Sequence, residues 1–225
     1  MNKLLFFSLR MLTGLTLCAL STVMAIKSNL GSSPWDVFHQ GLSNVFGITI
    51  GQASIIVGLI IVMIVSKLGI KIGIGTLANM LIIGCFIDII MHINIIPTSN
   101  HLFSGVLLII GSLFANAIGS YLYIGCEMGC GPRDGLMVIL VKITSKPVGR
   151  IRFFIEIIAL ITGYLLGGTV GIGTLLTVFG IGYCVQIVYK LFNFNVKGLK
   201  HKNIKEGFIF FKACINNNRR ATNDI

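Results

Sequence analysis

Long apolar stretches separated by short polar connections dominate the hydropathy pattern of this chain. A helix needs about 20 apolar residues to cross a bilayer, and six stretches approach or exceed that length. They cover residues 7–26, 52–65, 72–90, 102–124, 152–166 and 172–192, of which the second and fifth are short. Two shorter apolar segments, 34–46 and 132–143, precede the second and fifth spans. About 12 helical residues cover only about 18 Å, so each is expected to be a re-entrant or interfacial half-helix.

The composition supports a lipid environment for most of the chain. Hydrophobic residues make up 55% and charged residues 11% of the sequence, and the mean hydropathy is +0.92. A soluble domain carries about 25% charged residues, so this chain has too few charges to cover a surface that faces water. We therefore expect an all-α integral membrane protein whose main partner is the lipid bilayer, without a separate soluble catalytic domain.

The basic residues predict the orientation of the six spans. Of the 18 Lys and Arg residues, eight lie from Lys190 onward, and most others precede the first span or join spans two to three and four to five. The alternate connections, 92–101 and 167–171, contain no Lys or Arg, and only Lys27 falls on the opposite side. The positive-inside rule thus predicts cytoplasmic termini. The basic tail, 197–225, is expected to attract anionic lipid headgroups and not nucleic acid.

Two segments of the sequence recur at a constant offset of 98 residues. Residues 31–36 match 129–134 around a shared Gly-x-x-Pro-x-Asp pattern, and 73–77 match 171–175 as Gly-Ile-Gly-Thr-Leu. Further glycine pairs keep this offset: Gly51 with Gly149, Gly69 with Gly167, and Gly84 with Gly182. The sequence therefore predicts an internal repeat.

The repeat sets the expected domain organisation. Residues 1–98 and 99–196 form two membrane repeats of three spans each, followed by the tail at 197–225. Because three spans are an odd number, the second copy should enter the membrane from the opposite side. Inverted repeats with paired half-helices are common in transporters, where they surround a site near the middle of the bilayer.

The start of each half-helix has the residues that favour helix initiation. Ser33 suits the N-cap, Pro34 the first helical position, and Asp36 the third, where it complements unpaired amides. The equivalent residues of the second copy are Gly131, Pro132 and Asp134. Either the two aspartates only close the helix starts, or they also face a water-filled vestibule and bind a cation, a proton or an amine.

Two further pairs of positions are candidates for a pathway. Trp35 and Arg133 are equivalent, so an aromatic residue would mark the outer mouth and a cation the inner mouth, unless Trp35 is an interfacial anchor. Glu156 follows Arg152 by one helical turn and replaces Gly58 of the first copy. It is either half of an intrahelical ion pair or a titratable coupling group.

Other polar residues have less specific interpretations. Asn116 shares one helix face with Ser112 and Ser120, and this face serves either close helix packing or a polar pathway. The four histidines, His39 among them, are expected to face solvent or the interface. Asp88 is a candidate for an exposed helix end.

No cofactor or metal site is indicated by the sequence. Cys126 and Cys130 flank a glycine-rich loop without an accompanying histidine, so a metal site there is not expected. A catalytic motif such as His-Glu-x-x-His is missing from the sequence. We do not expect an enzyme.

Three motifs resemble those of a known family. Residues 30–37 read Leu-Gly-Ser-Ser-Pro-Trp-Asp-Val, 47–52 read Gly-Ile-Thr-Ile-Gly-Gln, and 129–136 read Gly-Cys-Gly-Pro-Arg-Asp-Gly-Leu. In these segments the chain resembles the YczE/YyaS/YitT group of bacterial membrane proteins, especially its YczE-like branch, over roughly residues 8–190. The resemblance implies a location in the bacterial cytoplasmic membrane and no established substrate.

Together, these patterns favour a small transporter or permease for an unknown small molecule or ion, with a homodimer as a candidate assembly. The expected pathway residues are Asp36, Asp134, Glu156, Trp35, Arg133 and Asn116, and the half-helix caps are Ser33, Pro34, Gly131 and Pro132. The alternative is a non-transporting membrane scaffold or regulatory subunit that holds a partner through its tail.

Overall fold

The computed structural model describes residues 3–69, 72–129, 131–194, 202–209 and 212. Within these ranges there are helices and no strands. The helices of 13 or more residues are α1 (Lys3–Lys27), α2 (Pro34–Phe46), α3 (Ile50–Lys67), α4 (Ile74–Ile93), α5 (Leu102–Ile124), α6 (Pro132–Thr144), α7 (Val148–Leu165) and α8 (Ile172–Leu191). They correspond to the six predicted spans and the two predicted half-helices, with ends that differ by a few residues.

Five of the described helices are long and apolar enough to cross a membrane: α1, α3, α4, α5 and α8. The chain is therefore a membrane protein with multiple apolar helices. The remaining predicted span, α7, has 18 residues but contains three charged side chains, Arg150, Arg152 and Glu156. Its composition alone does not identify it as a span.

The two short helices α2 and α6 begin in the same way. At α2, the Ser33 side chain accepts a hydrogen bond from the Asp36 backbone N–H, and Pro34 takes the first helical position. At α6, Gly131 is the N-cap and Pro132 follows it. Both helices end at a residue with positive φ, Gly47 (64°) and Ser145 (54°). Each is 13 residues long, and about 20 Å of helix does not cross a bilayer.

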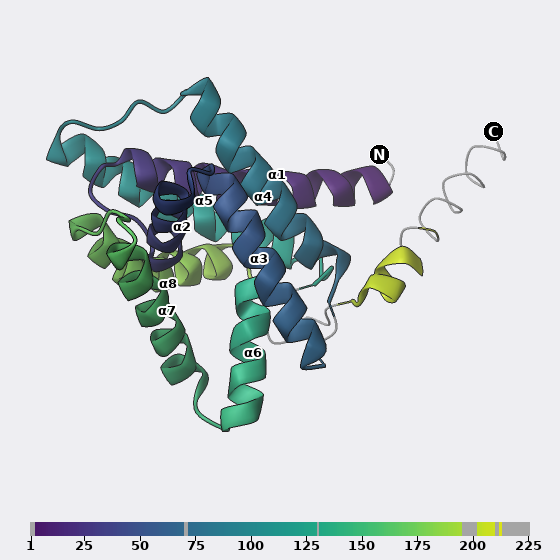
Figure 1. The fold of residues 1–225 in the computed structure, drawn as a ribbon. Coiled ribbons are helices and arrows are strands. Elements are labelled where there is room, and N and C mark those ends of the chain that lie inside the picture. The colour runs from purple at the N-terminus through teal and green to yellow at the C-terminus, as the bar shows by residue number, and fades with distance from the viewer. Residues whose placement is uncertain (1–2, 70–71, 130, 195–201, 210–211, 213–225) are drawn as a thin grey trace, which may run out of the picture.

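Helices α1 and α5 pack side by side and form the centre of the fold, with α4 against α1 and α8 against α5 (Figure 1). A Cβ at Gly14 would lie 2.9 Å from the carbonyl oxygen of Gly119, so the two backbones are close together. Helix α2 packs on α7 and α3, and α6 packs on α3 and α7. Small residues at helix contacts are typical of membrane proteins, because packing and not water exclusion drives helix association in lipid.

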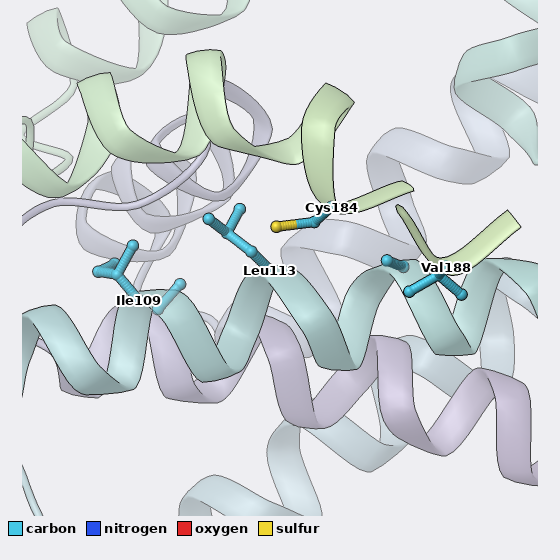
Figure 2. Packing of buried hydrophobic residues seen from close by; sticks show 6 residues of the cluster. Ile109, Leu113, Cys184 and Val188 are labelled. Carbon is cyan, nitrogen blue, oxygen red and sulfur yellow. The ribbon is translucent and has the colours of Figure 1, made fainter. Parts of the chain in front are cut away.

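One buried hydrophobic cluster joins α5 to α8. Ile109 and Leu113 project from α5 toward Cys184 and Val188 of α8, as Figure 2 shows. All four side chains are at most 9% exposed. A second cluster joins α3 to α6, with the Trp35 ring of α2 against it. These clusters hold the two short helices and the surrounding spans in fixed positions.

The two halves of the chain make reciprocal contacts at positions 98 residues apart. The Gly75 N–H donates to the Met128 carbonyl at 2.7 Å, and the Gly173 N–H donates to the Leu30 carbonyl at 2.7 Å. Gly75 corresponds to Gly173 and Leu30 to Met128, so each half donates to the other through the same bond. The helix pairs α1–α4 and α2–α7 have equivalents in α5–α8 and α6–α3. The contact between α3 and α4 has no equally extensive equivalent between α7 and α8.

Asp88 does not form the exposed helix end that was expected. Its carboxylate is half-buried and accepts hydrogen bonds from the Thr49 hydroxyl at 2.5 Å and from the Gly51 N–H at 2.8 Å. Thr49 and Gln52 also form a reciprocal capping box at the start of α3. Asp88 therefore stabilises the N-terminus of α3 from the neighbouring helix, because a carboxylate pairs well with the unsatisfied amides there.

Only part of the predicted basic tail lies among the described residues. Residues 204–209 are helical, and their start is attached to the helical core. The Lys202 N–H donates to the Glu127 carbonyl at 2.8 Å, and the Ile204 N–H donates to the Ile72 carbonyl at 3.0 Å. The side chains of Lys202 and Glu127 also form an ion pair at 3.8 Å. Most of the basic residues predicted to meet lipid headgroups lie outside the described residues.

Candidate functional site

A cavity of about 300 Å³ lies among the helices, and all eight contribute to its lining. The first turns of both half-helices reach it, through residues 33–36 of α2 and 131–134 of α6. Hydroxyl, amide, carboxylate and guanidinium groups line it together with apolar side chains. Its volume is at the lower end of the range for ligand-binding pockets, about 300–1,000 Å³, which suits a small molecule.

The lining residues come from equivalent positions of the two halves. Of the 33 residues that line the cavity, 28 fall into 14 pairs that are 98 positions apart. Examples are Cys18 with Asn116, Thr22 with Ser120, and Trp35 with Arg133. A cavity surrounded in this way lies between the two halves and belongs to neither of them alone.

Asp36 lines the cavity with its carboxylate satisfied by hydroxyl groups. The Ser33 hydroxyl donates to one carboxylate oxygen at 2.6 Å, and the Thr22 hydroxyl of α1 donates to the other at 3.4 Å. The residue is only 6% exposed. Asp36 thus takes part in the start of α2 and also faces the cavity, so the two interpretations of this aspartate are compatible.

Trp35 and Arg133 meet in the cavity and do not mark two separate mouths. The Arg133 guanidinium carbon lies 4.8 Å from the centroid of the Trp35 ring, a cation–π contact. Much of the Arg133 surface is accessible, because the side chain lines the cavity. The expected separation of an aromatic and a cationic mouth is therefore wrong.

Three acidic side chains line the cavity together with Arg133. Asp134 is half-buried at the third position of α6, and Asp36, Asp134 and Glu156 all interact electrostatically with the Arg133 guanidinium. Glu156 accepts a hydrogen bond from the Arg152 side chain at 3.0 Å, in the ion pair suggested by their spacing. Both residues of this pair also line the cavity. The ion-pair interpretation of Glu156 is therefore confirmed, and its role as a titratable coupling group stays a prediction.

Asn116 lines the cavity from α5 with Ser112 and Ser120, so this polar face is directed inward. The Ser120 hydroxyl donates to the Asn116 side-chain oxygen at 3.3 Å. The Ser112 hydroxyl donates to the Ile109 carbonyl at 2.7 Å, one turn earlier in the helix. This helix face therefore lines the cavity, and its role in a polar pathway stays a prediction.

His39 is a site residue that sequence reasoning placed wrongly. It was expected to face solvent or the interface, but it is 1% exposed and lines the cavity from α2. Its Nδ1 atom has no hydrogen-bond partner among the described residues. The signal that identifies it is its spacing, since His39 follows Asp36 by three residues and so shares its helix face. Asn79, Tyr123 and Thr177 also line the cavity and were not singled out.

Within the described ranges, no group of three or more His, Cys, Asp or Glu side chains is arranged to hold a metal ion. Cys126 is a buried free thiol, and its potential partner Cys130 lies outside the described residues.

Comparison with known proteins places the chain among bacterial membrane proteins. It matches the family of unknown function DUF6198 over residues 7–190. It is 36% identical to the uncharacterised membrane protein YczE of Bacillus subtilis, over 73% of this chain and 76% of that protein. An uncharacterised protein of Haemophilus influenzae is 34% identical over 78% of this chain and 80% of its own length. The uncharacterised protein YyaS of Bacillus subtilis is 28% identical over 73% and 83%. No solved structure matches the chain. The resemblance predicted from the motifs is confirmed.

Proposed function

The chain belongs to the family of unknown function DUF6198, and we propose that it is a membrane transporter or permease for a small molecule or ion. The proposed binding site is the cavity between the two halves, and the proposed location is the bacterial cytoplasmic membrane. The single observation that carries this proposal is the set of residues that line the cavity. Both half-helices present their first turns to one hollow that equivalent positions of both halves enclose.

The proposal includes six spans, with α7 as the fifth. Two of the charged side chains that lower its apolar character, Arg152 and Glu156, line the cavity and pair with each other. Ionisable groups inside a membrane usually face a bundle interior or a water-filled cavity, and those of α7 fit this rule. With α7 counted, each half contributes three spans and one half-helix.

An odd number of spans in each half makes the second half enter the membrane upside down, with both termini in the cytoplasm. The reciprocal bonds from Gly75 to Met128 and from Gly173 to Leu30 support a two-fold relation between the halves. In inverted-repeat transporters, movement of one repeat against the other exposes a central site alternately to the two sides. We expect the packing of α2 on α7 and the packing of α6 on α3 to change in turn as the site opens to one side and then to the other.

Transport is tested with purified protein in proteoliposomes. The vesicles are exposed to a mixture of isotope-labelled amino acids, amines and organic acids, and their contents are measured by mass spectrometry. We expect at least one compound to accumulate above the level in protein-free vesicles. The Asp36→Asn and Asp134→Asn variants should fold, by gel filtration, and should lose most of this uptake. Equal uptake with and without protein, or full uptake by both variants, would contradict the proposal.

A scaffold or regulatory subunit that holds a partner through its tail is the second candidate. Because Lys202 and Ile204 bind the core, a chain truncated after Ile209 keeps these contacts and loses only the distal tail. A transporter truncated in this way should retain ligand binding and uptake. A scaffold should instead lose a partner that co-purifies with the full-length chain.

A further inference from the structure

Each half-helix is preceded by a close backbone contact with the other half of the chain. Residues 73–75, at the start of α4, pack against residues 128–129, which lead into α6, and we call this contact the α4 junction. The equivalent α8 junction packs residues 171–173 against residues 30–31. Each junction contains one of the two reciprocal backbone hydrogen bonds. Because the half-helix that follows lines the cavity with its first turn, movement at a junction would move one wall of the cavity.

Part of the tail lies directly against the α4 junction. A Cβ at Gly73 would lie 2.8 Å from the Lys202 carbonyl oxygen, and a Cβ at Gly207 would lie 2.8 Å from the Ile74 side chain. Distances this short leave no room for another side chain between the tail and the start of α4. We call residues 202–209 the strap.

The strap is bonded to both sides of the α4 junction. On the α6 side, the Lys202 N–H donates to the Glu127 carbonyl at 2.8 Å, and the two side chains form an ion pair at 3.8 Å. On the α4 side, the Ile204 N–H donates to the Ile72 carbonyl at 3.0 Å. Partly exposed ion pairs contribute little, so the two backbone bonds carry most of the attachment. If the junction opens, the strap has to release at least one side.

The strap is held in a defined conformation by its own helix start. The Asn203 side chain accepts a hydrogen bond from the Glu206 N–H at 2.9 Å, and the Glu206 carboxylate accepts one from the Asn203 N–H at 3.0 Å. This reciprocal capping box makes Ile204 the first helical residue, whose N–H has no partner within its own helix. The Ile204 N–H is therefore available for the bond to Ile72.

The two junctions differ in this attachment. Around Gly171, the equivalent of Gly73, the three atoms nearest to an added Cβ belong to Leu30 and Gly31. In the part of the chain that the structure describes, a third segment thus lies this close to Gly73 and not to Gly171. The strap adds stability to one of two otherwise equivalent contacts. A contact that is made in only one of two alternating conformations shifts the equilibrium toward that conformation.

We propose that the strap regulates access to the cavity: bound across the α4 junction, it holds closed the side of the cavity that faces the tail. This inference rests on the proposed function for the movement that the strap opposes. Opening on that side separates the residues before α6 from the start of α4, and this separation breaks the bond to Glu127 or the bond to Ile72. Release of the strap therefore favours the conformation that is open toward the tail.

Access is measured on a single cysteine, Asn116→Cys, in the cavity, after the native cysteines have been replaced. Membrane vesicles that expose the tail are treated with a charged thiosulfonate reagent, and protease removal of a C-terminal tag confirms their orientation. A chain that ends after residue 201 lacks the strap and should be labelled about fivefold or more faster than the full chain, since two backbone hydrogen bonds are lost. A chain that ends after Ile209 keeps the strap and should be labelled at the rate of the full chain. Equal rates in the two truncated chains overturn the inference.

A point variant tests the strap in the full-length chain. Ile204→Pro removes the N–H that bonds the Ile72 carbonyl, and proline suits the first position of a helix. It should raise the labelling rate by about twofold to tenfold, the effect of one lost hydrogen bond. Ile204→Ala keeps the N–H and is the matched control. Equal labelling of these two variants overturns the inference, and this comparison decides it even if the chain that ends after residue 201 does not fold.

The two proposals fail in different ways. If loss of the strap speeds labelling but no compound enters proteoliposomes, transport is wrong and the control of access by the strap stands. If a compound enters the vesicles while labelling is the same with and without the strap, transport stands and the role of the strap is wrong.

Discussion

Replacing Gly51 by alanine tests a contact that is present in only one half of the chain. A Cβ at Gly51 would overlap with the Gly84 carbonyl oxygen and would lie 2.6 Å from an Asp88 carboxylate oxygen. Ordinary contact begins at 3.4 Å, so Asp88 would have to move by about 0.8 Å (3.4 − 2.6). The equivalent position, Gly149 in α7, has open space around it, with nothing within 4 Å.

The expected cost of Gly51→Ala has two parts. Overpacking in a close helix contact costs about 1–3 kcal/mol. Displacement of Asp88 also weakens its bonds from the Thr49 hydroxyl and the Gly51 N–H, each worth about 1.5–3 kcal/mol for a charged acceptor. Partial loss of these bonds gives a total of about 2–5 kcal/mol. Gly149→Ala removes no contact and should be neutral or stabilising by up to about 1 kcal/mol, the helix preference of alanine over glycine.

The assay is thermal unfolding of both variants in the same detergent, followed by tryptophan fluorescence and by aggregation on gel filtration. Gly51→Ala should lower the midpoint by several degrees, and Gly149→Ala should leave it unchanged or raise it slightly. The reasoning is refuted if both variants shift the midpoint equally, or if Gly149→Ala is the more damaging of the two.

Two further predictions concern the attachment of α2 and the topology. The Gln40 side chain forms hydrogen bonds with the Ser32 hydroxyl at 2.7 Å and with the Thr169 hydroxyl at 2.5 Å. Gln40→Met should therefore destabilise the fold by about 1–3 kcal/mol in the same thermal assay. An unchanged melting midpoint would show that these two hydrogen bonds do not stabilise the fold. Reporter fusions should show a cytoplasmic end after residue 209 and an external loop at 92–101, and the same side for both would rule out the six-span arrangement.

The sequence predicted the helices well because hydropathy and helix-start chemistry are local. The bounds of α2 are those expected from Pro34 and the glycine at position 47, and the 98-residue offset reappears in reciprocal hydrogen bonds between the halves. Local patterns also identified Asp36 and Asp134 at the first turns that line the cavity. These features depend on residues that are close in the chain or on simple repetition.

The errors arose where the answer depends on packing between distant segments. Trp35 and Arg133 occupy equivalent positions, and the sequence analysis placed them at opposite mouths. In the structure the two side chains are in contact, because both lie where the two halves of the chain face each other. The sequence predicted a surface position for His39, but the packing of α2 against neighbouring helices buries this side chain. Asp88 received its role from Thr49 and Gly51 across a helix contact that has no equally extensive equivalent in the second half.

The central claim is that a polar cavity, accessible to water-soluble molecules, lies between the two halves of the membrane domain. It is tested most directly by labelling single cysteines with a charged thiosulfonate reagent in proteoliposomes, after the six native cysteines have been replaced. The two variants are Asn116→Cys and Phe114→Cys. Position 116 lines the cavity, whereas position 114, two residues earlier on α5, lies on the exposed outer face. Charged reagents react in water and not in lipid. The account predicts labelling at position 116 and no labelling at position 114; equal labelling of both, or none at 116, would contradict it.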